Sequence, residues 1–224
     1  MTEYLKTLKA LDLEEVPFSE VNLSVLSSLL KRVLAPGTRR KHAINLRACL
    51  GIPVPCPKAQ QKVYDLPSVA ELHAALEASS YRMWGLAMLY AGLRLGESCT
   101  NQPIKGNVLT VDRQRLPDGS ISGPKTAGPV IVPQWFAEEY AAHDFTRSHN
   151  TVYVGIRRAG KKAGLQINPH QLRHAFATNL VKAGAQPNIL QAQMRHHDVA
   201  ISLKFYVQHT QGDIEAIMNG FGKA

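Results

Sequence analysis

The segment from His170 to Tyr206 concentrates side chains that suit chemistry on an anion. It contains two arginines, four histidines and one tyrosine, and its single carboxylate is that of Asp198. Fixed cations hold phosphate oxygens, imidazoles move protons, and a tyrosine hydroxyl serves as a nucleophile. These are the groups that cleavage of a phosphodiester requires when no metal takes part.

The first part of this segment is predicted to be a helix with basic side chains near its N-terminus. Asn168 is a suitable N-cap, and Pro169 fits the first helical position. Apolar residues recur at every fourth position, while His170, Arg173 and His174 share an adjacent face. The positive end of the helix dipole also favours an anion there. Taken alone, His174 fits a buried histidine whose ring nitrogens have hydrogen-bond partners in the core. The predicted anion site therefore depends on His170 and Arg173.

A metal site is the main chemical alternative for these histidines. His170 and His174 have the spacing of metal ligands on one helix face, and His196 or His197 would complete a set of three. Arg173 projects from the same face, however, and would repel a divalent cation. The sequence therefore predicts a site without metal or other cofactor.

Two further cations lie upstream of this segment. Arg94 leaves an apolar helix and is costly to bury unpaired, and Glu97, three residues further on, is placed to hold its guanidinium. Lys125 stands at the end of a predicted strand, where a lysine reaches outward and suits a general acid. Lys105 is the second choice for that role, because it precedes the predicted strands.

In combination these residues resemble the motifs of the tyrosine recombinase family, which includes the phage integrases. The motifs are Arg94 with Glu97, His170 with Arg173, and His197 nine residues before Tyr206. The resemblance covers roughly residues 63–210. It implies a mainly α fold with a small three-stranded antiparallel sheet (α+β), in a two-domain protein that clamps DNA.

The resemblance also implies a role for each residue of the site. Arg94 and Arg173 would clamp the scissile phosphate. Tyr206 would attack the phosphorus, forming a 3′-phosphotyrosyl bond and freeing a 5′-hydroxyl, and Lys125 would protonate that leaving oxygen. The histidines His170 and His197 would assist proton transfer and bind a phosphate oxygen, respectively. Three supporting residues are expected beside them, which are Glu97, His174 and His196.

The third motif departs from the family pattern. Family members usually carry glycine just before its histidine, and this chain carries His196. His196 therefore either adopts a left-handed conformation at a helix end or takes the role of His197, and the spacing to Tyr206 favours His197. We also expect no arm-type DNA-binding domain. A short amphipathic helix is expected over 213–219, packed on a neighbouring protomer or on its own.

The charge of the chain indicates a polyanionic partner. Its 224 residues carry a net charge of +9, with a sequence pI of about 9.6. Nucleic acid is the commonest such partner, because binding releases its condensed counterions. Residues 31–62 carry basic side chains and no acidic one, which is typical of a binding surface. Six of them are predicted to contact DNA, namely Lys31, Arg32, Arg39, Arg40, Lys41 and Arg47.

Hydrophobic periodicity predicts a helical N-terminal domain, residues 1–62, of the core-type DNA-binding kind. Its helices are expected over 4–11, over 21–34, and from a Thr38 N-cap to Gly51. The proline-rich stretch that begins at Ile52 predicts a stiff interdomain linker that runs through residue 65.

Residues 63–224 are predicted to form the catalytic domain. Helices are expected over 69–78, 82–92, 134–142 and 151–160, with more from residue 168 onward. Between them, three strands over 108–111, 121–125 and 130–132 predict an antiparallel meander.

Three further features bear on the compartment. The spacing of the three cysteines, Cys49, Cys56 and Cys99, is not typical of a disulfide pair or a zinc site. We therefore expect reduced thiols, as in an intracellular protein. The N-terminus lacks the apolar region of a signal peptide. The longest apolar run, 84–93, is too short to span a bilayer. We expect no membrane association and a cytoplasmic, nucleoid-associated protein of a bacterial host.

The predicted function is site-specific recombination of duplex DNA at core-type attachment sites, integrating or excising a phage or mobile element. We expect a tetramer on synapsed DNA, without ATP or metal, because the phosphotyrosyl link retains the ester bond energy. One alternative is DNA relaxation of the type IB topoisomerase kind. Another is a DNA-binding regulator whose catalytic residues are vestigial.

Overall fold

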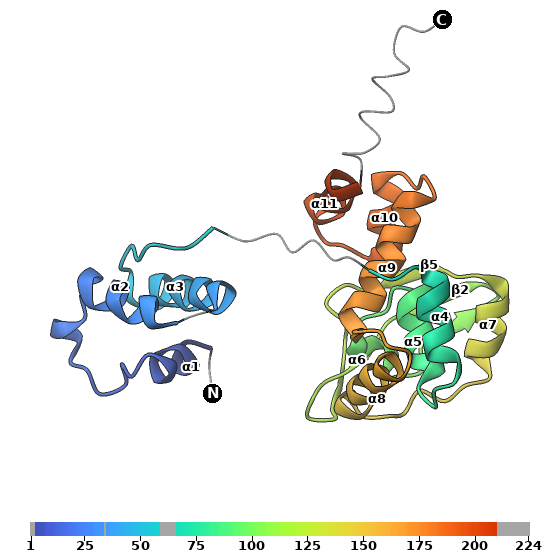
Figure 1. Ribbon diagram of the computed structural model, residues 1–224, viewed down its shortest axis with the longest axis horizontal. Coiled ribbons are helices and arrows are strands. Elements are labelled where there is room, and N and C mark those ends of the chain that lie inside the picture. Colours follow the sequence, from blue (N-terminus) through green and yellow to red (C-terminus); the bar gives the residue numbers. More distant parts are fainter. Residues whose placement is uncertain (1–2, 34, 59–65, 210–224) are drawn as a thin grey trace, which may run out of the picture. The chain divides into compact units, whose positions relative to one another are not determined.

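The computed structural model describes residues 3–33, 35–58 and 66–209 (Figure 1). The chain divides into two compact units, Met1–Val63 and Tyr64–Ala224, and the predicted boundary between residues 62 and 63 lies beside this division. The expected helix over 213–219 and the end of the expected linker lie outside the described residues. No helix in the described part of the chain is long and apolar enough to cross a membrane.

The first unit consists of short helices around a small apolar core. They are α1 (Glu3–Ala10), the 3-10 helix η1 (Phe18–Glu20), α2 (Leu23–Arg32) and α3 (Pro36–Leu50). Leu26 and Leu30 of α2 pack with Ala43 and Leu46 of α3. Helix α3 begins earlier than expected, because Pro36 fits a first helical turn. Thr38 therefore lies inside the helix and is not its cap, whereas Gly51 ends it with φ 68°.

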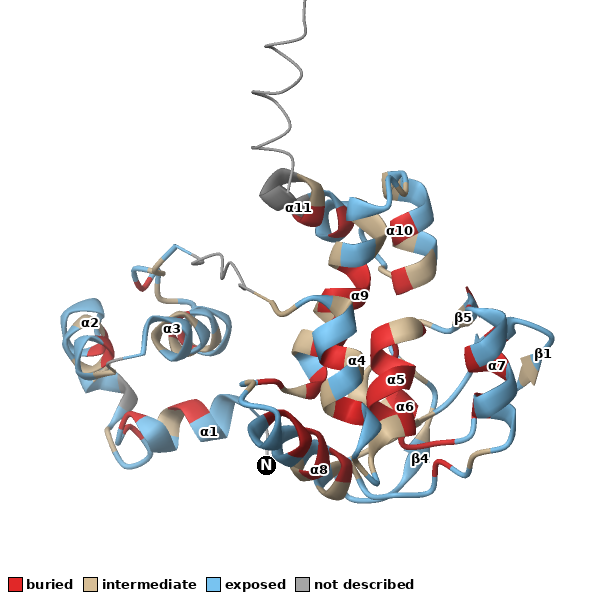
Figure 2. Cartoon of the chain, turned by 45° about the vertical axis from the view of Figure 1, so that its right-hand side comes forward, coloured by how far each residue is buried: buried red, intermediate tan, exposed pale blue. Residues whose placement is uncertain are grey.

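The second unit is mainly helical and is built around one buried helix. Its first helices are α4 (Val69–Glu77), α5 (Arg82–Tyr90), α6 (Leu95–Ser98) and α7 (Gln134–Ala141). The later helices are α8 (His149–Lys162), α9 (Pro169–Lys182), α10 (Pro187–Met194) and α11 (Val199–His209). Every residue of α5 from Met83 to Leu89 is buried, and α4, α8 and α9 pack around it (Figure 2).

Two small antiparallel sheets stand in place of the predicted meander. One contains β1 (Ile104–Lys105), β2 (Val108–Val111) and β5 (Gly128–Ile131), in the order β1-β2-β5. The other pairs β3 (Gln114–Arg115) with β4 (Ile121–Ser122). The three-stranded sheet is confirmed, but the prediction that 121–125 forms its middle strand is wrong. Buried Leu109 and Val130 face each other across β2 and β5, which explains why those strands pair directly.

The last helices form a second apolar cluster that carries the C-terminal motif residues. Phe176 of α9, Leu190 and Met194 of α10, and Phe205 of α11 are buried together. Asn168 caps α9 as predicted, because its Oδ1 accepts the backbone N–H of Gln171 at 3.1 Å. Arg173 of α9 donates hydrogen bonds to the Gly92 carbonyl, in the turn after α5, and to the Met194 carbonyl at the end of α10. These contacts bring three distant stretches of sequence together.

Candidate active site

Arg94 and Glu97 form a fixed pair at the start of α6. The fully buried Glu97 carboxylate accepts the Arg94 backbone N–H at 2.8 Å through Oε2. It accepts Arg94 Nη1 at 2.7 Å through Oε1, so the predicted pairing is present. The Arg94 side chain is 28% exposed, so its guanidinium lies at the border between the core and solvent.

A second arginine, Arg195, holds the other side of the same carboxylate. Its Nη2 donates to Glu97 Oε2 at 2.6 Å, and its side chain is only 2% exposed. Burial acts to raise the pKa of Glu97, but the charges of Arg195 and Arg94 outweigh burial and lower that pKa below its ordinary value. Glu97 is therefore ionised at neutral pH and carries the negative charge between two guanidiniums.

The residue in left-handed conformation at the end of α10 is Arg195, with φ 50° and ψ 49°. Among the described residues other than glycine, only Asp12 shares a positive φ, so the expectation that His196 adopts this conformation is wrong. Sequence reasoning did not select Arg195 as a site residue. The available signal was its place directly before the histidine pair, at the end of a helix, where glycine usually supplies the left-handed turn.

Arg173 is buried beside this pair and is held by backbone carbonyls. It donates to the Gly92 carbonyl in the turn after α5 and, at 2.6 Å, to the Met194 carbonyl at the end of α10. Burial first, and then the charges of Arg94 and Arg195, lower the pKa of Arg173 to about 9. Three guanidiniums thus approach one another around a single carboxylate, an arrangement that favours binding of an anion.

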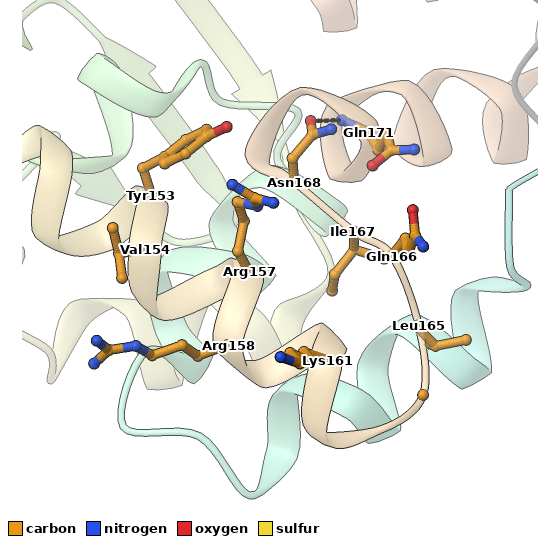
Figure 3. Close-up of a pocket in the computed structure, with 11 residues that line it drawn as sticks. Tyr153, Val154, Arg157, Arg158, Lys161, Leu165, Gln166, Ile167, Asn168 and Gln171 are labelled. Carbon is orange, nitrogen blue, oxygen red and sulfur yellow. Dashed lines mark hydrogen bonds between the residues drawn. The ribbon is translucent and has the colours of Figure 1, made fainter.

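Arg94, Arg173 and His170 line one cavity of about 470 Å³, together with Tyr153 and Asn168. Tyr153 and Asn168 also line a larger neighbouring cavity, of about 840 Å³, between α8 and the start of α9. Arg157 extends between these two residues in that cavity, with its guanidinium 5.8 Å from the Tyr153 ring centroid (Figure 3). Arg158 and Lys161 line it further along, and no acidic residue does. The described surface beside the arginines is therefore basic.

The histidines of α9 lie against each other at the edge of the site. The Nε2 atoms of His170 and His174 are 2.9 Å apart. Burial and the charge of Arg173 lower the pKa of His170. Burial, His170 and Arg173 lower the pKa of His174 to about 4. Among the described residues, no three His, Cys, Asp or Glu side chains gather closely enough to hold a metal ion.

His196 is the more buried of the two adjacent histidines, and the charges of the nearby arginines act on it. Its Nδ1 lies 2.9 Å from Ser202 Oγ, and its ring stacks on Phe205 with centroids 6.2 Å apart. Burial lowers the pKa of His196 to about 4, and the charges of Arg173 and Arg94 contribute. His197 is exposed. The preference for His197 rested on its spacing to Tyr206, and the role of either histidine stays a prediction.

The structure does not bring the Tyr206 hydroxyl to the arginines. That hydroxyl donates to the carbonyl of Ala185, in the turn between α9 and α10. The preceding residue, Phe205, is buried and faces the site, with its ring centroid 5.2 Å from that of His174. Burial raises the pKa of Tyr206. The nucleophile assignment therefore stays a prediction.

The two candidate lysines occupy different places from those expected. Lys125 is exposed in the connection from β4 to β5, beyond the end of β4. Lys105 is the last residue of β1 and does not precede the strands, so that reason for ranking it second is wrong. A side chain added at Gly128, where β5 begins, would meet Arg195 Cδ at 3.9 Å. The connection that carries Lys125 therefore ends beside the arginine cluster.

Several predicted DNA-binding residues of the first unit serve internal contacts. Arg39 donates to the Val33 carbonyl, Arg40 to the Pro57 carbonyl and Arg47 to the Val54 carbonyl. Lys41 pairs with Glu3. The remaining two, Lys31 and Arg32, are exposed at the end of α2. Arg40 and Arg47 thus hold the proline-rich segment on α3, and contacts of all six residues with DNA stay predictions.

Known proteins are similar to parts of this sequence. Residues 136–212 match the phage integrase family. The chain is 28% identical to tyrosine recombinase XerA of Thermococcus kodakarensis over 150 residues, 57% of this chain and 52% of that protein. It is 27% identical to tyrosine recombinase XerD of Staphylococcus aureus over 192 residues, 74% of this chain and 65% of that protein. The matches thus span about half to two thirds of these relatives.

Solved structures share the fold at lower sequence identity. The Tn1549 transposon integrase in complex with circular intermediate DNA superposes with a TM-score of 0.74 at 20% identity, covering 96% of this chain and 91% of that one. A lambda integrase dimer bound to a core site gives 0.63 at 15% identity, covering 93% and 88%. Arg94, His170 and Arg173 line one cavity, and in sequence and fold this chain is similar to the phage integrase family of tyrosine recombinases.

Proposed function

We propose that this protein is a site-specific DNA recombinase that cuts and rejoins duplex DNA through a covalent link to Tyr206. The observation that carries this proposal is the cavity shared by Arg94, His170 and Arg173, beside a buried and ionised Glu97. A phosphodiester placed there would meet two guanidiniums, each able to donate two parallel hydrogen bonds. Preorganised donors of this kind supply roughly 3 kcal/mol of transition-state stabilisation each.

The proposed reaction conserves the ester bond. The Tyr206 oxygen attacks the phosphorus and loses its proton, and the bond from phosphorus to the 5′-oxygen breaks. Lys125 protonates the departing 5′-oxygen, leaving a 3′-phosphotyrosyl link and a free 5′-hydroxyl. The 5′-hydroxyl of a second strand then attacks the same phosphorus and releases Tyr206. No step requires ATP.

The depressed histidine pKa values suit this chemistry. His170, His174 and His196 all have lowered pKa values, so their rings are neutral near pH 7. A neutral imidazole has one nitrogen free to accept a proton, so His170 can act as the base for the nucleophile. His196 is the better placed of the third-motif histidines to bind a phosphate oxygen, since it lies toward the arginines.

Before it attacks, Tyr206 must leave the Ala185 carbonyl. Helix α11 therefore has to shift or turn when DNA occupies the site. Neighbouring positions on a helix differ by about 100° in direction, so a rotation of that size would exchange Phe205 for Tyr206. DNA binding thus prepares the nucleophile in this proposal.

Duplex DNA is the proposed substrate, and a tetramer on two synapsed attachment sites is the proposed assembly. The net charge of +9 and the basic cavity lined by Arg157, Arg158 and Lys161 support DNA as partner. The bound DNA in the structures of the transposon and lambda integrases supports the same inference. Integration or excision of a phage or mobile element is the reaction that such an enzyme would perform.

The test is a nicked DNA substrate carrying the protein's own attachment site, which traps the covalent intermediate. We expect an SDS-resistant adduct whose linked residue is Tyr206, formed equally well with EDTA. Tyr206→Phe should abolish the adduct and retain DNA binding. Tyr81→Phe, which alters a ring packed against Gly155, is the matched control. An adduct in the Tyr206→Phe protein would show that the nucleophile is assigned wrongly. Relaxation of supercoils without any attachment site would instead identify a topoisomerase.

A further inference from the structure

The arginine cluster contains one member that the proposed reaction does not use, which is Arg195. It is almost completely buried, and it adopts a backbone conformation that glycine takes with less strain. Among the described residues, its Nε and Nη1 have no hydrogen-bond partner. A buried arginine with two unused donors, in a strained conformation beside a proposed phosphate site, calls for a functional explanation.

The two arginines divide the Glu97 carboxylate between them. Arg94 Nη1 donates to Oε1 at 2.7 Å, and Arg195 Nη2 donates to Oε2 at 2.6 Å. Arg94 is 28% exposed and lines the cavity, whereas Arg195 is 2% exposed and is not among the residues that line it. Arg94 is therefore the one that is able to turn toward DNA, and Arg195 is the one that stays.

Moving Arg94 away from Glu97 would leave a buried charge unpaired unless Arg195 stays beside it. If Arg94 alone held Glu97, moving its guanidinium to a phosphate would leave a buried carboxylate with no charged partner, which is strongly unfavourable. Arg195 already contacts one oxygen, and its unused Nη1 and Nε are neighbours of the nitrogen that makes this contact. An arginine that adds a second parallel hydrogen bond forms the bidentate pair that is its strongest arrangement with a carboxylate.

We propose that Arg195 is a positioning residue that takes over Glu97 when Arg94 turns to the DNA phosphate. This inference rests on the proposed function, since it names how that site frees one of its two clamping arginines. The site holds the positive charges of three guanidiniums and the negative charge of one carboxylate, from Arg94, Arg173, Arg195 and Glu97. Its excess positive charge remains when Glu97 passes from Arg94 to Arg195. Lowered pKa values of Arg173 and Arg195, to which Arg94 contributes, agree with guanidiniums that already repel one another.

The test uses Arg195→Gly, which relieves the left-handed backbone and should therefore fold. We expect the first-order rate of adduct formation to fall about tenfold or more, because Arg94 stays bound to Glu97. Affinity for uncut DNA should stay within about threefold, because the other phosphate contacts are unchanged. Adding Glu97→Gln should restore much of the lost rate, since the neutral amide releases Arg94. Arg82→Gln, which removes a guanidinium paired with Glu77 and Glu139, is the control for loss of an arginine.

A second measurement separates this inference from the proposed function. Inorganic phosphate is titrated into full-length protein labelled with nitrogen-15 in its arginine side chains. The Arg94 Nε–H signal should shift in the wild type and need about tenfold more phosphate in Arg195→Gly. Absence of any adduct in the wild type would overturn the recombinase proposal, and this titration would still decide on Arg195. The role of Arg195 would be overturned if the Arg195→Gly protein cleaved DNA and responded to phosphate as the wild type does. It would also be overturned if adding Glu97→Gln did not restore the cleavage rate.

Discussion

Replacing Glu97 with glutamine tests whether the charge at the centre of the arginine cluster holds the second unit together. The carboxylate is fully buried and accepts hydrogen bonds from the guanidiniums of Arg94 and Arg195. Glutamine keeps the shape of the side chain but loses the charge and one acceptor. The variant therefore leaves the buried Arg195 without a charged partner.

The magnitude follows from the exposure of the two partners. Removing one member of a buried ion pair costs about 3–5 kcal/mol. Because glutamine retains one acceptor oxygen, we expect a loss of about 3 kcal/mol in the free energy of unfolding. In an Arg195→Gly background the same replacement should cost only about 1 kcal/mol, because the remaining partner, Arg94, is partly exposed to solvent. The difference between the two values measures the coupling of Glu97 to Arg195.

Urea unfolding followed by tryptophan fluorescence measures this effect on the second unit alone. The chain has two tryptophans, and both Trp84 and Trp135 belong to that unit. Glu77→Gln is the matched control, since this exposed carboxylate pairs with Arg82 at the surface and its loss should cost less than about 1 kcal/mol. A Glu97→Gln protein as stable as the wild type would refute the electrostatic account of the cluster.

The same replacement should change how stability depends on acid. Burial acts to raise the pKa of Glu97, but Arg195 and Arg94 outweigh it and lower that pKa. A carboxyl with a lowered folded-state pKa stabilises the protein fully above its unfolded pKa of about 4.3. This stabilisation is lost as the pH falls through the folded-state value. The wild type should therefore lose more stability than Glu97→Gln below about pH 4.

The remaining predictions concern the turn before Arg94 and the histidines. Gly92→Ala should destabilise the second unit by about 2 kcal/mol or more, because φ is 58° and the new Cβ would meet the Phe176 ring at 2.5 Å. Thermal unfolding measures this loss. Gly164→Ala is the control that separates backbone strain from the steric clash, because Gly164 has φ 73° and open space around it. His174 and His196 should titrate with pKa values of about 4 in imidazole proton NMR, since burial disfavours their charged forms. A midpoint near 6.5 for either ring would contradict its described burial.

Much of the helical structure followed from local signals. Asn168 with Pro169 begins α9, as predicted, and α4 begins at Val69, where the predicted helix starts, after a capping box formed by Ser68 and Glu71. Such signals act over three or four residues, so they are legible without knowledge of the fold. The pairing of strands is not local. The segment 121–125 has strand character, yet its first residues pair with Gln114 and Arg115, because β2 and β5 bury complementary faces against the core.

The candidate site likewise combines features that the sequence predicts with features that depend on tertiary packing. The types and order of Arg94, Glu97, His170 and Arg173 in the sequence predicted a phosphate-binding site, because guanidiniums and imidazoles are the donors that such a site needs, and that chemistry stays a prediction. Spacing did not determine which of two adjacent residues faces the site. Successive residues on a helix point about 100° apart, so a turn at the end of α10 or a rotation of α11 exchanges one neighbour for the next.

Tertiary structure alone made those choices. Arg195 ends α10 in a left-handed conformation, with its guanidinium buried against Glu97, and after it His196 is half-buried while His197 is exposed. Packing of α11 on α9 then buries Phe205 against the histidines and leaves Tyr206 on the Ala185 carbonyl. The sequence by itself thus determined the set of reactive groups. The packing of three helices decided which of them meet, because burial of apolar area sets helix rotation more strongly than a single polar contact does.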